Sequence, residues 1–353
     1  MQQRMLGRTG LDVSAIGMGG IPIRRPPFDE AVALYRQAMD RGITFFDAAR
    51  GYLRCEDRLG EAIRGRREEV VIASKCGDRT AEGVAQAIEE SLRTLGTEYL
   101  DVYECHGVCQ FEDLEACLAP GGALEGLQAA QAQGKIRFTG LTGHNADVLL
   151  KAVQTGAFDV ILVIFNYMND EPARELLPYC AEHGIGVTVM KPLGGSTLAG
   201  HADLALRWVL QHPVHSAAVG MWRAWEVETN ARLGEDPQPL TAEETSILSE
   251  QRAWRSPMHC RLCYRHHKCP QGVDITDLMI ADLCYTRHGI AELMGRGWGE
   301  RIEAAGQCLT CAMADECRAS CPYSVDIPGY LARAHAAYMP LVQAYRSGVA
   351  GGQ

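Results

Sequence analysis

The sequence contains no long apolar run and no excess of positive charge. Its longest strongly apolar stretch, VILVIF at 160–165, is far shorter than the roughly 20 residues of a membrane-spanning helix. No apolar segment at the N-terminus resembles a signal peptide. The 34 Lys and Arg residues against 44 Asp and Glu give a net charge of −10, which disfavours nucleic acid as a partner. These absences predict a cytoplasmic protein that binds neither a membrane nor nucleic acid.

A glycine-rich dinucleotide fingerprint is also absent, and this absence bears on the fold. Apolar strand patterns alternate with helical patterns at a spacing of about thirty residues. The expected strands are 14–17, 44–46, 70–74, 101–105, 137–141, 160–165, 186–190 and 217–219, and the helical patterns include 81–95, 124–132, 146–153 and 171–182. Parallel strands joined by helices in this way close into a (β/α)₈ TIM barrel. The alternative, a doubly wound sheet, would normally carry the missing fingerprint.

Four polar residues stand at the ends of three of these strands. Asp47 ends the strand at 44–46 and Tyr52 follows five residues later, whereas Lys75 and His106 directly follow the next two strands. The active site of a barrel lies at the carboxyl ends of its strands. The ordinary pKa of a phenol is about 10, and a neighbouring ammonium favours its ionisation. A carboxylate can pair with that ammonium, and an imidazole can hold a carbonyl oxygen. Any one of these residues alone is better explained as a satisfied polar group, but the set of four indicates catalysis.

At these positions the chain resembles the aldo-keto reductases. FFDAARGY carries Asp47 and Tyr52, IASK carries Lys75, and DVYECHG carries His106, while the opening RMLGRTGLDVSAIGMGG resembles the family's N-terminal hairpin and first strand. The resemblance extends from about residue 5 to residue 233. It implies a (β/α)₈ barrel in which these four residues catalyse carbonyl reduction, or alcohol oxidation, with NAD or NADP.

The same resemblance implies where the cofactor binds. The implied contacts are Gly20, Thr142, Gly143, Met190, Pro192, Leu193, Gly220, Arg223 and Asn230. The resembling proteins hold the nicotinamide with a Ser-Asn pair, a Gln and a Tyr, and the aligned positions here are Thr142 with Gly143, Leu162, and Met190. Without the two amide side chains, each buried carboxamide group left unpaired costs about 1–3 kcal/mol, so weak nicotinamide binding is expected.

The adenine end leaves the choice between the two nicotinamide cofactors open. Glu226 stands where the resembling proteins have an arginine for the 2′-phosphate. A carboxylate there repels a phosphate and could accept a hydrogen bond from a ribose hydroxyl. Arg223 could compensate for the missing arginine.

Eight of the fourteen cysteines lie between Cys260 and Cys321, in CxxC groups followed by Cys-Pro. The second group is Cys308-x₂-Cys311-x₅-Cys317-x₃-Cys321-Pro, which is the bacterial ferredoxin spacing with three extra residues. Structural zinc is the alternative, because CxxC pairs with nearby histidines also suit a tetrahedral site. YECHG, APGGALEGL, GLTGHN and VMKPLGG resemble a branch of the aldo-keto reductases that carries a C-terminal ferredoxin-like domain. That resemblance implies two 4Fe–4S clusters.

The crossed ferredoxin pattern assigns the cysteines to two clusters. One takes Cys308, Cys311, Cys317 and Cys269, and the other takes Cys260, Cys263 and Cys321 with one position open. Cys284 is the expected fourth ligand because thiolate is the usual one, but His266 is in register with the cysteine of the resembling proteins. An internal repeat accompanies the groups, CPQGVDI at 269–275 and CPYSVDI at 321–327, and a helix is expected after each copy.

These patterns predict three segments and leave three functions open. The segments are a barrel at 1–236, a linker and helix at 237–256 that begins with a capping box at Thr241 and Glu244, and a small, mostly helical ferredoxin-like domain at 257–353. The favoured function is an oxidoreductase for a small carbonyl or alcohol, with clusters that exchange electrons with a ferredoxin-like partner. The alternatives are proton transfer or elimination without a nicotinamide, and a non-catalytic electron carrier or sensor.

Overall fold

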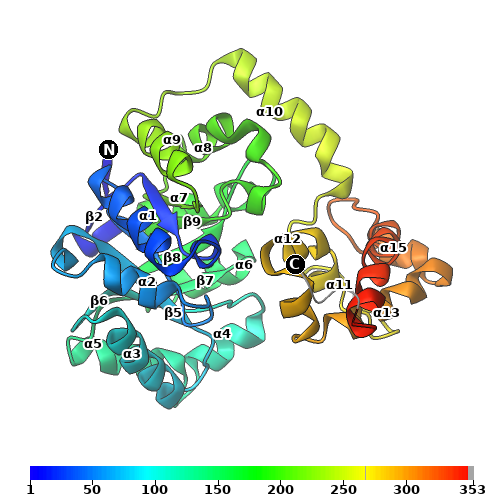
Figure 1. The fold of residues 1–353 in the computed structure, drawn as a ribbon, viewed down its shortest axis with the longest axis horizontal. Helices are drawn as coiled ribbons and strands as arrows, with labels where there is room; N and C mark the ends of the chain where they lie inside the picture. The colour runs from blue at the N-terminus through cyan, green and yellow to red at the C-terminus, as the bar shows by residue number, and fades with distance from the viewer. Residues whose placement is uncertain (267, 349–353) are drawn as a thin grey trace. The chain divides into compact units, whose positions relative to one another are not determined.

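The computed structural model describes residues 1–266 and 268–348 (Figure 1). The chain divides into two compact units, Met1–Thr245 and Ser246–Gln353, and each is described by itself. The division falls inside helix α10 (Ala242–Arg255), within the segment 237–256 that was predicted to connect the two domains. The predicted capping box is present there, because the Glu244 carboxylate accepts from the Thr241 amide at 2.8 Å and the Thr241 hydroxyl accepts from the Glu244 amide at 3.2 Å.

The first unit is a closed barrel of parallel strands. In chain order the strands are β3 (Ile16–Gly19), β4 (Phe45–Asp47), β5 (Val71–Cys76), β6 (Leu100–Cys105), β7 (Ile136–Gly143), β8 (Val160–Ile164), β9 (Gly186–Met190) and β10 (Ser216–Gly220). Each pairs with the next, and β10 closes the barrel by pairing in parallel with β3. The predicted (β/α)₈ TIM barrel is therefore confirmed.

One expected strand is shifted for a local reason. The strand expected at 14–17 begins instead at Ile16, because Ser14 ends β2 (Asp12–Ser14) of an antiparallel hairpin with β1 (Gln3–Met5). The Ser14 hydroxyl accepts hydrogen bonds from the amides of Thr44 and Phe45, which ties the hairpin to the start of β4. The hairpin therefore uses the first residue of the expected strand.

Helices α1 to α9 surround the strands (Figure 1). They are α1 (Phe28–Asp40), α2 (Cys55–Ala62), α3 (Ala81–Leu95), α4 (Phe111–Leu118), α5 (Ala123–Ala132), α6 (Ala146–Val153), α7 (Leu176–Glu182), α8 (Ala202–Leu210) and α9 (Ala224–Glu235). The helices expected at 81–95 and 146–153 have the predicted bounds, whereas the one expected at 171–182 begins at Leu176. Pro178 has no backbone N–H to donate, so it is tolerated only in the first turn of α7.

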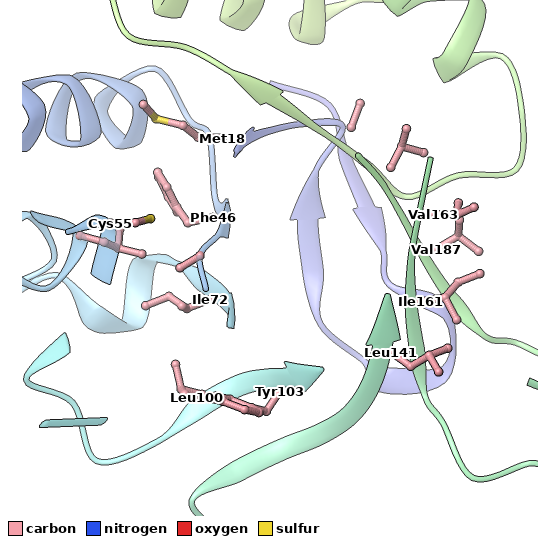
Figure 2. Packing of buried hydrophobic residues seen from close by; sticks show 14 of the residues in the cluster. Met18, Phe46, Cys55, Ile72, Leu100, Tyr103, Leu141, Ile161, Val163 and Val187 are labelled. Atoms are coloured by element: carbon pink, nitrogen blue, oxygen red, sulfur yellow. The ribbon is translucent and has the colours of Figure 1, made fainter. Parts of the chain in front are cut away.

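Alternate residues of each strand face opposite sides of the barrel wall. Figure 2 shows part of the outward set, which includes Phe46, Ile72 and Leu141 and packs in one buried cluster with residues of the surrounding helices. The inward set begins with Phe45, Val71 and Val102 near the amino ends of the strands, where Leu6 and Val13 of the hairpin segment pack against it; Leu11, Ala73, Val160 and Ala218 complete this buried cluster. Because apolar side chains fill the barrel interior near the amino ends of the strands, the polar groups near the carboxyl ends rest on an apolar layer.

The second unit is helical, and its described residues include no strand. Beyond α10 it contains α11 (Ile275–Leu278), α12 (Ala281–Met294), α13 (Trp298–Ala305), α14 (Ala314–Ala319) and α15 (Ile327–Arg346). Leu331 and Val342 of α15 pack with Leu278 and Ile302 in its buried core. No helix among the described residues is long and apolar enough to cross a membrane.

The internal repeat predicted from the sequence has a structural basis. Each copy is followed by a helix, α11 after the first and α15 after the second. The aspartate of each copy caps its helix, since Asp274 accepts from the Asp277 amide and Asp326 from the Gly329 amide, both at 3.2 Å. The isoleucine that ends each copy is buried, so the two copies use the same residues in the same way.

Candidate active site

Four polar side chains gather where the barrel strands end. Asp47 is the last residue of β4, Lys75 is next to last in β5, and His106 directly follows β6. Tyr52 lies in the segment between β4 and α2. Because the strands are parallel, their carboxyl ends share one edge of the barrel. The structure therefore brings the four predicted catalytic residues together.

Lys75 is the centre of this group. Its side chain is fully buried, and Nζ contacts the Asp47 carboxylate and donates to the Ala48 carbonyl oxygen at 2.7 Å. The same ammonium lies 4.9 Å from the centre of the Tyr52 ring. The Tyr52 and His106 rings meet edge to face with their centres 5.7 Å apart. The phenol, the ammonium and the imidazole thus border the same small region, in which a carbonyl oxygen could contact both rings.

Burial and charge distribute the protons in this group. Burial raises the pKa of the Tyr52 phenol, and the Lys75 ammonium lowers it only in part. Burial also lowers the pKa of Lys75, but the negative groups around it, Asp47 first, outweigh this and raise the net value. At neutral pH the lysine is therefore charged and the phenol is protonated.

The His106 imidazole is held in its neutral form. Burial lowers its pKa, the positive charges of Lys75, Lys191 and Arg79 lower it further, and the resulting value is about 3. A neutral imidazole can donate one hydrogen bond to a carbonyl oxygen but is not a proton source at pH 7. Tyr52 is therefore the proton donor that this arrangement offers.

Comparisons with known proteins agree with this geometry. A sequence model of the Aldo/keto reductase family matches residues 15–203, which is more than half of the chain. The chain belongs to the aldo/keto reductase family. The first part of the predicted resemblance is thus confirmed, whereas the branch with a C-terminal ferredoxin-like domain stays a prediction.

Relatives with known names share the barrel. L-galactose dehydrogenase of Arabidopsis thaliana is 36% identical over 212 residues, which are 55% of this chain and 66% of the relative. The NADH-specific methylglyoxal reductase of Escherichia coli is 28% identical over 231 residues, which are 57% of this chain and 70% of the relative. The chain thus spans about two thirds of the length of these relatives. A solved aldo-keto reductase of Klebsiella pneumoniae in complex with NADPH is 26% identical, with a TM-score of 0.59 over 71% of this chain and 96% of that one.

The residues predicted to contact the cofactor lie at the same edge of the barrel or just beyond it. Gly20 follows β3, Thr142 and Gly143 end β7, Met190 ends β9 and precedes Pro192 and Leu193, Gly220 ends β10, Arg223 precedes α9, and Asn230 is buried in α9. Gly143 has no room for a side chain, since a β-carbon there would lie 2.2 Å from the Val108 carbonyl oxygen. The family's asparagine is therefore sterically excluded at this position.

The adenine end differs from the sequence-based expectation. The Glu226 carboxylate accepts hydrogen bonds from the amides of Trp222 and Arg223 at 2.8 and 3.1 Å, so it caps the start of α9. Arg223 and Arg25 both stack on the Trp222 ring, at 4.2 and 5.0 Å from its centre. Arg24 is close enough to lower the pKa of Arg25, which burial lowers first. Positive side chains therefore gather here, and Glu226 is engaged by its own helix.

Several residues at the mouth of the barrel were not predicted from the sequence. Lys191, directly after β9, has Nζ 2.7 Å from Nε2 of His144, and its charge reaches both His106 and Asp47. The side-chain amide of Asn166, which follows β8, donates to the Lys191 carbonyl oxygen at 3.0 Å. These residues follow strands, as the catalytic four do, and this position was the available signal. Arg25 gave no such signal, because its place depends on stacking against Trp222.

Ligands expected for one of the two clusters line a cavity in the second unit. Cys260, Cys263, His266 and Cys321 all border it, and its volume is about 30 Å³. Burial raises the pKa of the Cys260 thiol to about 11, with further contributions from Cys263 and Cys321. Cys284 lies in α12 and is not among the residues that border this cavity.

The four thiols expected to hold the other cluster also lie near one another. Burial raises the pKa of the Cys308 thiol to about 11, and the neighbouring thiols of Cys269 and Cys311 add to this. Cys317 is affected in the same way by burial and then by those three thiols. Among the side chains that the structure describes, no group of three or more from His, Cys, Asp or Glu is placed to hold a metal ion. The predicted clusters therefore stay a prediction.

Proposed function

We propose that the barrel reduces a small carbonyl compound to an alcohol with NADPH or NADH, and catalyses the reverse oxidation. The observation that carries this proposal is the buried Lys75, which contacts Asp47 and lies 4.9 Å from the centre of the Tyr52 ring beside a neutral His106. This arrangement offers one protonated phenol and one neutral imidazole to a single oxygen atom.

Each side chain has a definite task in this reaction. A bound nicotinamide supplies the hydride that reaches the carbonyl carbon. Tyr52 gives its proton to the carbonyl oxygen, so that carbonyl, hydride and proton together form the alcohol. Lys75 stabilises the phenolate that remains, Asp47 keeps the lysine charged and in place, and His106 orients the oxygen.

Turnover assays with the substrates named for the two relatives test this function. NADPH or NADH oxidation is followed with methylglyoxal, and NAD reduction with L-galactose, in anaerobically purified full-length protein. Cofactor turnover that depends on either compound supports the proposal. No turnover with either compound or with a wider set of aldehydes, ketones and sugars contradicts it.

NADPH is the cofactor that the adenine end favours. Arg25 and Arg223 stack on Trp222 and Arg24 lies near Arg25, so positive charge gathers here. The Glu226 carboxylate is engaged by two backbone amides. Arginine suits a 2′-phosphate because its planar fork binds phosphate oxygens in pairs. These residues fit the phosphate end of the cofactor, whereas the nicotinamide end lacks the amides that the family uses.

We expect nicotinamide binding to be weaker than is usual for this fold. Gly143 and the buried Leu162 offer no side-chain hydrogen bond to a carboxamide, and each unpaired buried group costs about 1–3 kcal/mol, or roughly fivefold to 150-fold in affinity. Titration calorimetry with NADPH and NADH measures this. Absence of heat for both cofactors at about millimolar concentration would instead favour proton transfer or elimination without a nicotinamide.

The second unit is proposed to hold two 4Fe–4S clusters that exchange electrons with a ferredoxin-like partner. Two separate sets of side chains support two sites, one formed by Cys269, Cys308, Cys311 and Cys317 and the other by the cavity set. Thiolates are the usual ligands of such clusters. The side chains in both sets are of the type that iron–sulfur clusters require.

For the open ligand position we favour His266 over Cys284. His266 borders the cavity with Cys260, Cys263 and Cys321, and its Nε2 is 2.7 Å from the Thr276 hydroxyl. Imidazole ligation has a precedent in Rieske centres. We expect Cys284→Ala to keep all of its iron and its reduced-state EPR spectrum, and His266→Ala to change both. Loss of about half the iron in Cys284→Ala, with His266→Ala unchanged, would restore Cys284 as the ligand.

A further inference from the structure

Glu104 is a buried acid that the proposed reaction does not use. It is the next-to-last residue of β6, two positions before His106, and only 1% of it is exposed. Among the described residues, neither of its carboxyl oxygens has a hydrogen-bond partner. Its Oε2 lies 3.9 Å from Nζ of Lys75, which stands opposite it in the register of β5 and β6.

The barrel wall makes room for this side chain. Gly140 is its register partner on the other side, in β7, and a β-carbon there would lie 2.9 Å from Cγ of Glu104. Glu104 therefore faces the barrel interior, as Val102 does, between the catalytic lysine and a glycine. A buried polar group without hydrogen bonds is destabilising, and leucine or valine would fill this space without that cost. A destabilising buried acid beside a catalytic lysine indicates a functional role.

The charges around Glu104 determine its form. Asp47 from β4 and Lys75 from β5 already form a neutral pair, Tyr52 lies in the segment after β4, and Gly140 contributes no charge from β7. Burial raises the pKa of the Glu104 carboxyl to about 8, with the Lys75 ammonium opposing and the Asp47 carboxylate adding to the rise. At pH 7 the group is therefore mostly a neutral carboxylic acid.

Ionisation of Glu104 would act on the proton donor. A negative charge at this position is among the influences that raise the pKa of Tyr52, after burial and Asp47. A second carboxylate also competes with the phenolate for the single ammonium of Lys75. Both effects make the Tyr52 proton harder to give up, so reduction slows when Glu104 loses its own proton.

We propose that Glu104 is a positioning residue, held as a neutral carboxylic acid against Lys75, whose ionisation at alkaline pH weakens proton transfer from Tyr52. This inference rests on the proposed carbonyl reduction for its kinetic consequence. Its structural part, a neutral acid beside the catalytic lysine, does not depend on the reaction.

The kinetic test compares pH profiles of kcat and kcat/KM for methylglyoxal reduction with saturating NADPH. At pH 9 about nine-tenths of a group with a pKa of about 8 is ionised, so the wild-type rate should fall between pH 7 and pH 9, by up to about tenfold. Glu104→Gln keeps a neutral side chain at every pH, so its rates at pH 7 and pH 9 should be similar. Glu98→Gln, which removes an exposed carboxylate, serves as the matched control and should follow the wild type. An unchanged alkaline decline in Glu104→Gln would overturn the inference.

An infrared measurement tests the same inference without turnover. The wild-type spectrum minus that of Glu104→Gln should show the C=O stretch of a protonated carboxyl at pH 7, and the band should vanish between pH 7 and 9. Glu104→Leu provides the same subtraction if the glutamine variant does not fold. A carboxylate band at pH 7 in both subtractions would refute the proposal even if methylglyoxal is turned over. A protonated band in a protein that reduces no carbonyl would instead mean that only the proposed function has failed.

Discussion

Replacing Tyr52 by phenylalanine is expected to lower the rate of carbonyl reduction by about 10²–10⁴-fold. The variant keeps the ring, which packs partly against the buried core and lies beside Lys75 and His106, and removes only the proton donor. The neutral His106 cannot take over this task at pH 7 because its pKa is about 3. Steady-state turnover with NADPH and circular dichroism measure activity and fold in the same preparation.

The control for this variant is Tyr99→Phe. Tyr99 directly precedes β6, its hydroxyl bonds to the Glu68 carboxylate, and its ring packs against Arg67, so its loss should leave turnover unchanged. If Tyr52→Phe retained more than about a tenth of wild-type turnover, another group would have to carry the proton. In that case the assignment of Tyr52 as the acid is wrong.

Replacing Cys308 by serine is expected to remove about half of the iron from anaerobically purified protein. Cys308 belongs to the proposed set with Cys269, Cys311 and Cys317, and a cluster that loses one of four thiolates is poorly held. Metal binding is coupled to folding in small metal-containing units, so the second unit should also unfold at a lower temperature. Iron and sulfide analysis gives the first result, and thermal unfolding gives the second.

A cysteine of the barrel provides the comparison. Cys180 is buried in α7, and Cys180→Ala should leave the iron content unchanged because this thiol is a small core residue. Full iron in Cys308→Ser, or the absence of iron in the wild type together with bound zinc, would rule out the proposed iron–sulfur cluster at this set.

The barrel could be predicted from the sequence because its signals are local. Strands such as β8 are continuous apolar runs, and α3 begins after Thr80, whose side chain accepts from the Gly83 amide, and ends before Gly96, which is in a left-handed conformation. The start of α7 was mispredicted because the helical pattern continues upstream of it. Pro178 lacks the backbone N–H that a helix beginning at residue 171 would need, so α7 begins at Leu176 although the apolar pattern extends further upstream.

The grouping of the four proposed catalytic residues could be predicted because three of them stand at strand ends and Tyr52 follows one of these, and parallel strands bring such ends to one edge. The role of Glu226 could not, because only the structure shows that its carboxylate caps its own helix. The place of Glu104 beside Lys75 depends on the register of β5 and β6, which a sequence does not specify. In the same way, the cavity that His266 shares with three cysteines is a property of the folded loops.

Transfer of deuterium from a labelled nicotinamide tests the central claim most directly. NADPH carrying deuterium at C4 of the nicotinamide is incubated with the full-length protein and the carbonyl compound that it turns over, and the alcohol is analysed by mass spectrometry and NMR. The proposed reaction predicts deuterium on the carbinol carbon of the wild-type product, and a rate lower by about 10²–10⁴-fold in Tyr52→Phe. An alcohol without deuterium, or a product formed equally well without NADPH, would contradict hydride transfer at this site.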